Sequence, residues 1–234
     1  MKLSYCLLLT LCLGGLSCGL SNVKPDPAMR KSAEEVVKRY QGKISYTYGV
    51  SESISKGKSK YVELTLEGSP LLNSSDEEYK TIAAGGIAYT FYKPLEKNVK
   101  FTGINIVIKD DTMEYKYPIQ VKSLIRFDSL LKKFETVMDL YDSARFDQLV
   151  ETIDGGEADS AKQQFITYLK DHQVENGPVT RKSPFFGFGA YEKNGRNRMV
   201  ACYRVIREKN SHWLELYMDL SGNQPKITGV KHLK

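Results

Sequence analysis

Residues 197–220 form the sequence NRMVACYRVIREKNSHWLELYMDL. Two runs that alternate apolar and polar residues flank the polar triplet at 208–210, a pattern typical of two strands joined by a turn. Along the second run, one face carries Leu214, Leu216, Met218 and Leu220, and the other carries Trp213, Glu215, Tyr217 and Asp219. The stretch therefore predicts an antiparallel strand pair with one face toward a core.

The flanking sequence extends this pair to four strands. We expect strands at about 179–192 and 225–233, with turns at 193–195 and 221–223, and hence an antiparallel meander. The first strand contains the aromatic segment 185–189, which lacks the residues of a phosphate-binding loop. Alternation places Phe186 and Phe188 on one face, and Phe185 and Tyr191 on the other or in an interdomain contact.

Three helices are predicted before the meander. The clearest spans 128–141, where the apolar residues follow the helical period, and shorter ones span 144–153 and 160–172. The pair Gly155-Gly156 ends the second helix, and Asn176-Gly177-Pro178 ends the third.

This order of elements resembles a known superfamily. The segments that carry the resemblance are SARFDQLV at 143–150, WLELY at 213–217 and PKITGV at 225–230. Residues 127–234 thereby resemble the nuclear-transport-factor-2-like (cystatin-like) superfamily, and are similar to its uncharacterised members in bacterial secreted proteins and lipoproteins. The resemblance implies a curved sheet wrapped around helices, with a cone-shaped cavity between them.

The resemblance also suggests an enzymatic alternative. Some members are ketosteroid-isomerase-like enzymes with a carboxylate base and a tyrosine or acid donor, for which Asp219 with Tyr217 or Tyr203 are the matching residue types. Alternation directs Asp219 and Tyr217 away from the helix-packed face. We therefore expect no catalytic residues, and a small hydrolase or isomerase that uses the cavity is the alternative.

The first half of the chain predicts a separate helix and sheet set. We expect a helix ended by Gly42, a hairpin from 44–54 and 61–67, a helix after the capping-box signature at 75–78, and strands at 101–109 and 114–121. Gly85 and Gly86 inside that second helix indicate close packing against a neighbour. The expected fold is α+β with two small domains, at 30–122 and 123–234.

The N-terminus resembles a bacterial lipoprotein leader. Lys2 precedes a short apolar run, so residues 1–17 are expected to be a signal peptide, followed by a lipidated Cys18 and a tether at 18–29. Ordinary signal-peptide cleavage without lipidation is the alternative. The prediction is an exported envelope protein anchored to a bacterial membrane, with the periplasmic or surface face left open.

Cysteine and histidine positions indicate no cofactor. Cys202 lies in an apolar strand, which favours a buried, inert thiol. His172, His212 and His232 have no paired spacing, so we expect no metal site and no cofactor.

The outward face of the meander is the candidate binding surface. Trp213 and Tyr217 share this face near Arg204 and could bind a glycan or a partner protein, unless the first domain covers them. Residues 178–234 contain eleven Lys and Arg against four Asp and Glu, so Arg196 and Arg198 could contact an anionic envelope surface or simply face solvent. Nucleic acid is not an expected partner outside the cell. The predicted role is non-catalytic binding of a small ligand, a glycan or a protein.

Overall fold

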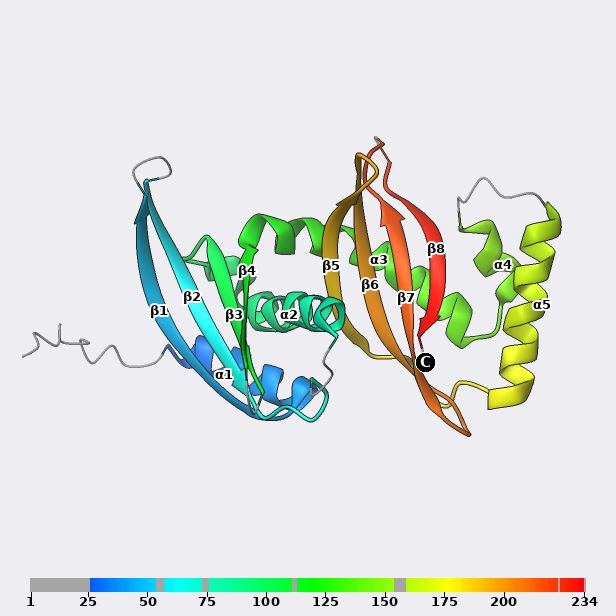
Figure 1. Cartoon of the computed structure of the whole chain (residues 1–234), viewed down its shortest axis with the longest axis horizontal. Coiled ribbons are helices and arrows are strands. Elements are labelled where there is room, and N and C mark those ends of the chain that lie inside the picture. Colours follow the sequence, from blue (N-terminus) through cyan, green and yellow to red (C-terminus); the bar gives the residue numbers. More distant parts are fainter. Residues whose placement is uncertain are drawn as a thin grey trace, which may run out of the picture.

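The computed structural model describes residues 26–53, 57–72, 76–110, 113–153, 159–222 and 224–233. The predicted leader at 1–17, Cys18 and the tether up to residue 25 lie outside these residues. The chain is an α+β protein with two four-stranded sheets on either side of a central helix, α2 (Glu77–Tyr92) (Figure 1). Within the described ranges, no helix is long and apolar enough to cross a membrane.

The N-terminal half builds a mixed sheet in the order β1-β2-β3-β4. Its elements are α1 (Pro27–Tyr40), β1 (Lys43–Ser53), β2 (Gly57–Glu67), α2, the 3-10 helix η1 (Lys93–Asn98), β3 (Gly103–Lys109) and β4 (Glu114–Gln120). β2 and β3 run parallel because α2 and η1 connect them, and the other two pairs are antiparallel, which confirms the predicted hairpin. α1 begins inside the predicted tether, where the Asp26 carboxylate accepts the N–H of Ala28 at 2.9 Å.

α2 is buried on every side because it packs against both halves. The Asp76 side chain caps the helix by accepting the N–H of Glu78 at 2.9 Å, and all residues from Ile82 to Tyr92 are buried. A Cβ on Gly86 would lie 2.2 Å from the carbonyl oxygen of Phe186, and one on Gly187 would lie 2.2 Å from that of Ile82. The predicted close packing of the helix glycines is confirmed, and the neighbour is strand β5.

The C-terminal half packs three helices on a second sheet. Its elements are α3 (Val121–Asp142), α4 (Phe146–Glu151), α5 (Asp159–Asn176), β5 (Phe185–Lys193), β6 (Arg196–Ile206), β7 (Ser211–Asp219) and β8 (Lys226–Leu233). The strands form the predicted antiparallel meander in the order β5-β6-β7-β8. Asn194 and Gly195 connect β5 to β6 with φ values of 54° and 70°, as a tight two-residue hairpin requires.

Two boundaries differ from the sequence prediction. α3 begins at Val121 instead of Asp128, because Leu124 and Phe127 continue its buried face. β5 begins at Phe185 instead of residue 179, and Val179 forms a single bridge with Arg207.

A register shift between Phe185 and Gly187 overturns the predicted common face of Phe186 and Phe188. The predicted interdomain contact of Phe185 is confirmed, because its ring lies 6.1 Å from that of Tyr89 on α2. The extra residue makes the strand bulge, so Phe185 and Phe188 both contact Phe127 of α3, at centroid distances of 5.2 and 4.1 Å. Phe186 lies on the opposite side, 4.5 Å from the ring of Trp213. Simple alternation was wrong here because a bulge changes which face the following residues take.

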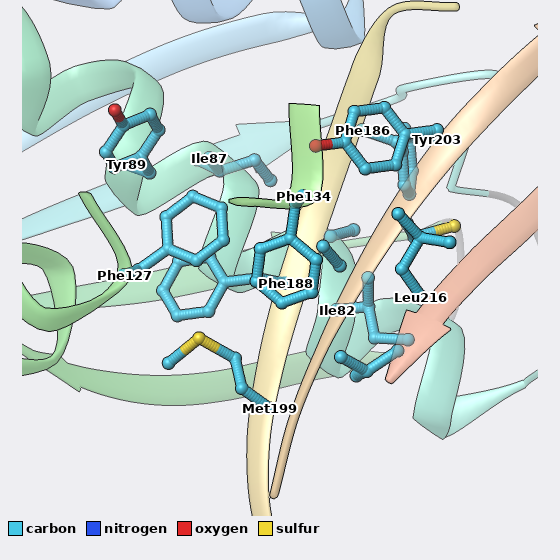
Figure 2. Packing of buried hydrophobic residues seen from close by; sticks show 14 of the residues in the cluster. Ile82, Ile87, Tyr89, Phe127, Phe134, Phe186, Phe188, Met199, Tyr203 and Leu216 are labelled. Atoms are coloured by element: carbon cyan, nitrogen blue, oxygen red, sulfur yellow. The ribbon is translucent and has the colours of Figure 1, made fainter. Parts of the chain in front are cut away.

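The meander therefore has two distinct faces. The helix face packs against α3, α4 and α5 and carries Phe188, Tyr203, Leu214, Leu216 and Met218. The opposite side, called the groove face below, carries Cys202, Arg204, Trp213, Glu215 and Tyr217. Figure 2 shows Phe127 and Phe188 stacked in the core beside Phe134. One cluster of buried apolar side chains includes residues from both halves of the chain.

Candidate functional site

Trp213 on the groove face is half-buried by the N-terminal half of the molecule. Its ring lies 4.5 Å from that of Phe186 and 5.4 Å, edge-on, from that of Tyr79 on α2. These aromatic contacts hold the indole in place, so Trp213 forms part of a fixed wall.

A groove of about 640 Å³ opens beside this wall. It lies between the C-terminal end of α1, the junction of α2 and η1, and the segment that leads into β5. The cations that line it are Lys38, Arg39, Lys93, Arg181, Lys182 and Arg204, whereas Glu35 is the acidic side chain in its lining. The groove is therefore strongly basic.

The lysines in the lining already have acidic partners. Lys38 pairs with Glu35 at 2.7 Å, and Lys182 pairs with Asp139 at 3.0 Å. Lys93 contacts both Glu96 and Asp128, at 2.8 and 2.9 Å. In contrast, Arg39, Arg181 and Arg204 make no ion pair with any carboxylate among the described residues.

Two of these arginines lie near aromatic rings. The guanidinium carbon of Arg204 is 5.8 Å from the centre of the Trp213 ring, and that of Arg39 is 6.0 Å from the Phe185 ring. Such contacts leave the guanidinium N–H donors available for a ligand. The groove thus combines unpaired, fork-shaped donors with aromatic surface, an arrangement that suits an anion with an apolar face.

The structure separates the remaining predicted surface residues from this groove. The Tyr217 hydroxyl donates a hydrogen bond to buried Glu215, so it is already occupied. Arg196 pairs with Asp219 at 3.6 Å beside the β5–β6 turn. Arg198 lies six residues before Arg204 on β6, which places it roughly 20 Å away along the strand.

The residues suggested for an isomerase-like reaction do not form a base and donor pair. Tyr217 shares the face of Asp219, but its hydroxyl already donates to Glu215. Tyr203 lies on the helix face, where its buried hydroxyl has no hydrogen-bond partner within the described ranges. Asp219 lies on the other face, and the N–H of Ser221 donates to it at 2.8 Å, which lowers its pKa. A base and an oxyanion donor would need to reach the same ligand, and these two side chains are on opposite sides of the sheet.

Asp142 is a half-buried carboxylate whose pKa is raised by burial. Both of its oxygens are occupied, because Ser183 donates its backbone N–H at 2.9 Å and its hydroxyl at 2.7 Å. The carboxylate therefore ties the segment before β5 to the end of α3.

The structure also places side chains together that the sequence spacing kept apart. His172, His212 and His232 converge at one end of the helix face, with one ring nitrogen of each within 4.8 Å of the others. The spacing of the three histidines in the sequence matches no metal-binding motif. However, alternation places His212 on the same strand face as Leu214 and Leu216, so a polar residue facing the core could have been noticed from the sequence. Cys202 is buried as predicted, and burial raises the pKa of its thiol.

Comparison with known proteins gives little guidance. No family model matches the chain, and no curated protein matches it. A solved structure described as that of Bdellovibrio bacteriovorus Bd1075 is similar at 12% sequence identity, with a TM-score of 0.35, over 81% of this chain and 75% of that one. Similarity at this level does not define a common fold.

Proposed function

We propose that this chain is an exported bacterial envelope protein, anchored by lipid at Cys18, that binds an anionic ligand in the basic groove without converting it. The observation that carries the proposal is the set of three arginines, Arg39, Arg181 and Arg204, that line one groove without acidic partners in the part of the chain that the structure describes. The resemblance of the C-terminal half to the nuclear-transport-factor-2-like superfamily belongs to the same proposal.

Among small ligands, glycans and proteins, an acidic saccharide fits the groove best. Guanidinium groups bind carboxylates and phosphates in a forked geometry, and aromatic rings pack against the C–H face of a sugar. The rings of Trp213 and Phe185 lie close to Arg204 and Arg39, so one ligand could use both kinds of contact. A volume of about 640 Å³ falls within the usual range for small-molecule sites.

Calorimetric titration of the mature chain with short uronic-acid oligosaccharides tests this function. We expect binding that weakens as salt is added, and no binding of neutral oligosaccharides of equal length. Arg204→Ala should lower the affinity by about 10- to 100-fold, because it removes a charge-assisted hydrogen bond.

Arg196→Ala is the matched control, since it removes the same charge from the same strand outside the groove. Equal losses of affinity in the two variants would show that the effect of Arg204→Ala comes from the change in net charge alone. No binding of any acidic oligosaccharide would refute this ligand class.

The anchor is tested separately by metabolic labelling with a palmitate analogue. Cys18 should carry the label, and Cys18→Ser should lose it. If the wild-type protein takes up no label, the result would instead support ordinary signal-peptide cleavage without lipidation.

A further inference from the structure

Three histidines from distant parts of the chain meet on rigid elements. His172 projects from α5, His212 from β7 and His232 from β8. Their ring centroids are 4.6 to 5.0 Å apart. This cluster is on the helix face, away from the basic groove, and the function proposed above does not use it.

Two tyrosines orient the imidazole rings. The Tyr141 hydroxyl lies 3.2 Å from Nε2 of His212 and 3.2 Å from Nε2 of His232. The Tyr168 hydroxyl lies 3.2 Å from Nδ1 of His232. Hydrogen bonds of this kind from an outer layer of residues fix ring orientation in metal sites.

Two ring nitrogens in the cluster have unused bonding capacity. The Nδ1 atoms of His172 and His212 are buried and have no hydrogen-bond partner among the residues that the structure describes. An imidazole nitrogen without a hydrogen-bond partner is the kind of atom that binds a metal ion.

We propose that His172, His212 and His232 form a binding site for a divalent transition metal of the zinc type. Zinc binds imidazole nitrogen at about 2.0–2.1 Å in tetrahedral geometry, so three ligating nitrogens lie roughly 3.3 Å apart. The observed separations of up to 4.8 Å must shorten by rotation of the side chains. His232, whose two ring nitrogens contact Tyr141 and Tyr168, must exchange one of these contacts for the metal. Carboxylate-binding metals such as Mg²⁺ and Ca²⁺ do not fit, because all three ligands are nitrogen.

Arg207 determines what completes the coordination. Its guanidinium donates to the Tyr141 hydroxyl at 2.8 Å and is buried, so it places a positive charge beside the cluster. That charge opposes a bare dication and favours an anion, such as hydroxide or chloride, as the fourth ligand.

A metal at this position would fasten α5 to the meander. The residues that α5 buries are Ile166 and Leu169, so its apolar anchorage is small for a helix of 18 residues. Coordination would join α5 to β7 and β8 by bonds much stronger than these contacts. The metal would therefore set the position of α5, while its fourth coordination position stays open to an exogenous anion.

Titration of the mature chain, produced without a histidine tag, with Zn²⁺ and with Co²⁺ tests the site. The chain contains three histidines, all in the cluster, so no other imidazole competes. We expect one equivalent of zinc per chain and a rise in Tm of about 5–10 °C at a free zinc concentration 100 times Kd. Bound Co²⁺ should show tetrahedral d–d absorption without a thiolate charge-transfer band.

His172→Ala is the informative variant because this half-buried side chain can be removed without opening the apolar core. Zinc affinity should fall by at least 100-fold, while the Tm in the presence of a chelator stays within a few degrees of wild type. Tyr168→Phe should keep the stoichiometry and weaken binding by roughly tenfold, as expected for a residue that only orients a ligand.

Imidazole ¹⁵N chemical shifts during zinc titration of the wild-type chain provide a measurement that does not depend on any variant folding. All three rings should shift together at one equivalent. Equal zinc binding by wild type and His172→Ala, a cobalt–thiolate band, or unchanged imidazole shifts would overturn the proposal. Groove binding should be unaffected by His172→Ala, so the two proposals fail independently.

Discussion

The two faces of the meander carry different ionisable groups although they share the same strands, with arginines lining the groove and imidazoles clustered on the helix face. Trp213 and His212 are neighbours in the sequence of β7, yet Trp213 lines a groove with unpaired arginines and His212 joins a cluster of imidazoles whose pKa values are lowered by burial. Water in the open groove solvates the guanidinium charges, whereas burial under α3 and α5 disfavours charged imidazole. The face of the sheet on which a side chain lies therefore helps to decide whether it stays charged and accessible to an anion or is available to bind a metal ion.

The faces also pack differently. The helix face is filled by large side chains, of which Phe127 and Phe188 stack at 4.1 Å (Figure 2). At β5, the groove face instead meets α2 through glycines that allow backbone to approach backbone. Substitutions on the two faces therefore test two different contributions to stability. Truncating a large side chain tests packing on the helix face, and adding a Cβ to a glycine tests the close backbone approach on the groove face.

Phe127→Ala should produce the largest effect. Phe127 is 0% exposed and contacts Phe134, Phe185 and Phe188, so its truncation leaves a cavity that costs about 3–5 kcal/mol. Urea unfolding followed by circular dichroism measures this loss. Ile125→Ala is the control on the same helix, since Ile125 is 55% exposed, and a comparable loss there would contradict the assigned core face.

Gly86→Ala should lower the free energy of unfolding by less than Phe127→Ala does, but by a measurable amount. The new Cβ would lie 2.2 Å from the Phe186 carbonyl oxygen and from the Tyr40 hydroxyl, so α2 and β5 must separate, at a cost of about 1–3 kcal/mol. The midpoint of thermal unfolding reports this change. Gly229→Ala is the matched control because its Cβ would meet nothing within 4 Å, and equal destabilisation by both would refute close packing as the reason for Gly86.

Trp213→Ala should act on binding more than on folding. Loss of this half-buried ring should cost about 1–2 kcal/mol of stability and lower affinity for an acidic oligosaccharide roughly tenfold, as a lost aromatic contact does. Calorimetry and urea unfolding on the same preparation separate the two effects. Unchanged affinity would place the ligand elsewhere.

Asp128→Asn should have the smallest effect and a defined pH dependence. Burial raises the pKa of Asp128, but the Tyr89 hydroxyl at 2.5 Å and Lys93 at 2.9 Å outweigh burial and hold it below its usual value. The carboxylate therefore stabilises the fold above its usual pKa, and the contribution is lost as pH falls through the lowered value.

In urea unfolding, we expect the free energy of unfolding of Asp128→Asn to be about 1 kcal/mol below that of wild type at pH 7, and this difference should shrink toward pH 2. Asp147→Asn is the control, because the Asp147–Lys170 pair is exposed and 3.5 Å apart. A deficit that persists unchanged at pH 2 would exclude charge as its cause.

Local sequence signals predicted most of the architecture. The turn at Asn194-Gly195, the start of α2 near Asp76 and the close approach at Gly86 each follow from the properties of a few adjacent residues. The beginning of α3 was predicted too late, because Phe127 owes its burial to Phe188 on β5 and Tyr89 on α2, which are distant in the sequence.

The candidate sites were only partly visible in the sequence. Arg204 and Trp213 were predicted as one surface and do lie together, whereas Arg39 and Arg181 come from α1 and from the segment before β5. No spacing rule connects positions so far apart along the chain.

The sequence by itself determined the α+β class, the four-strand meander, the buried Cys202 and the outward parity of Trp213, because alternation and turn chemistry act over a few residues. Only the tertiary structure decided the bulge at Phe186, the groove and the meeting of His172 with His212 and His232. The physical reason is that these features depend on how α2 and α5 pack on the second sheet, and packing between distant segments leaves no periodic mark in the sequence.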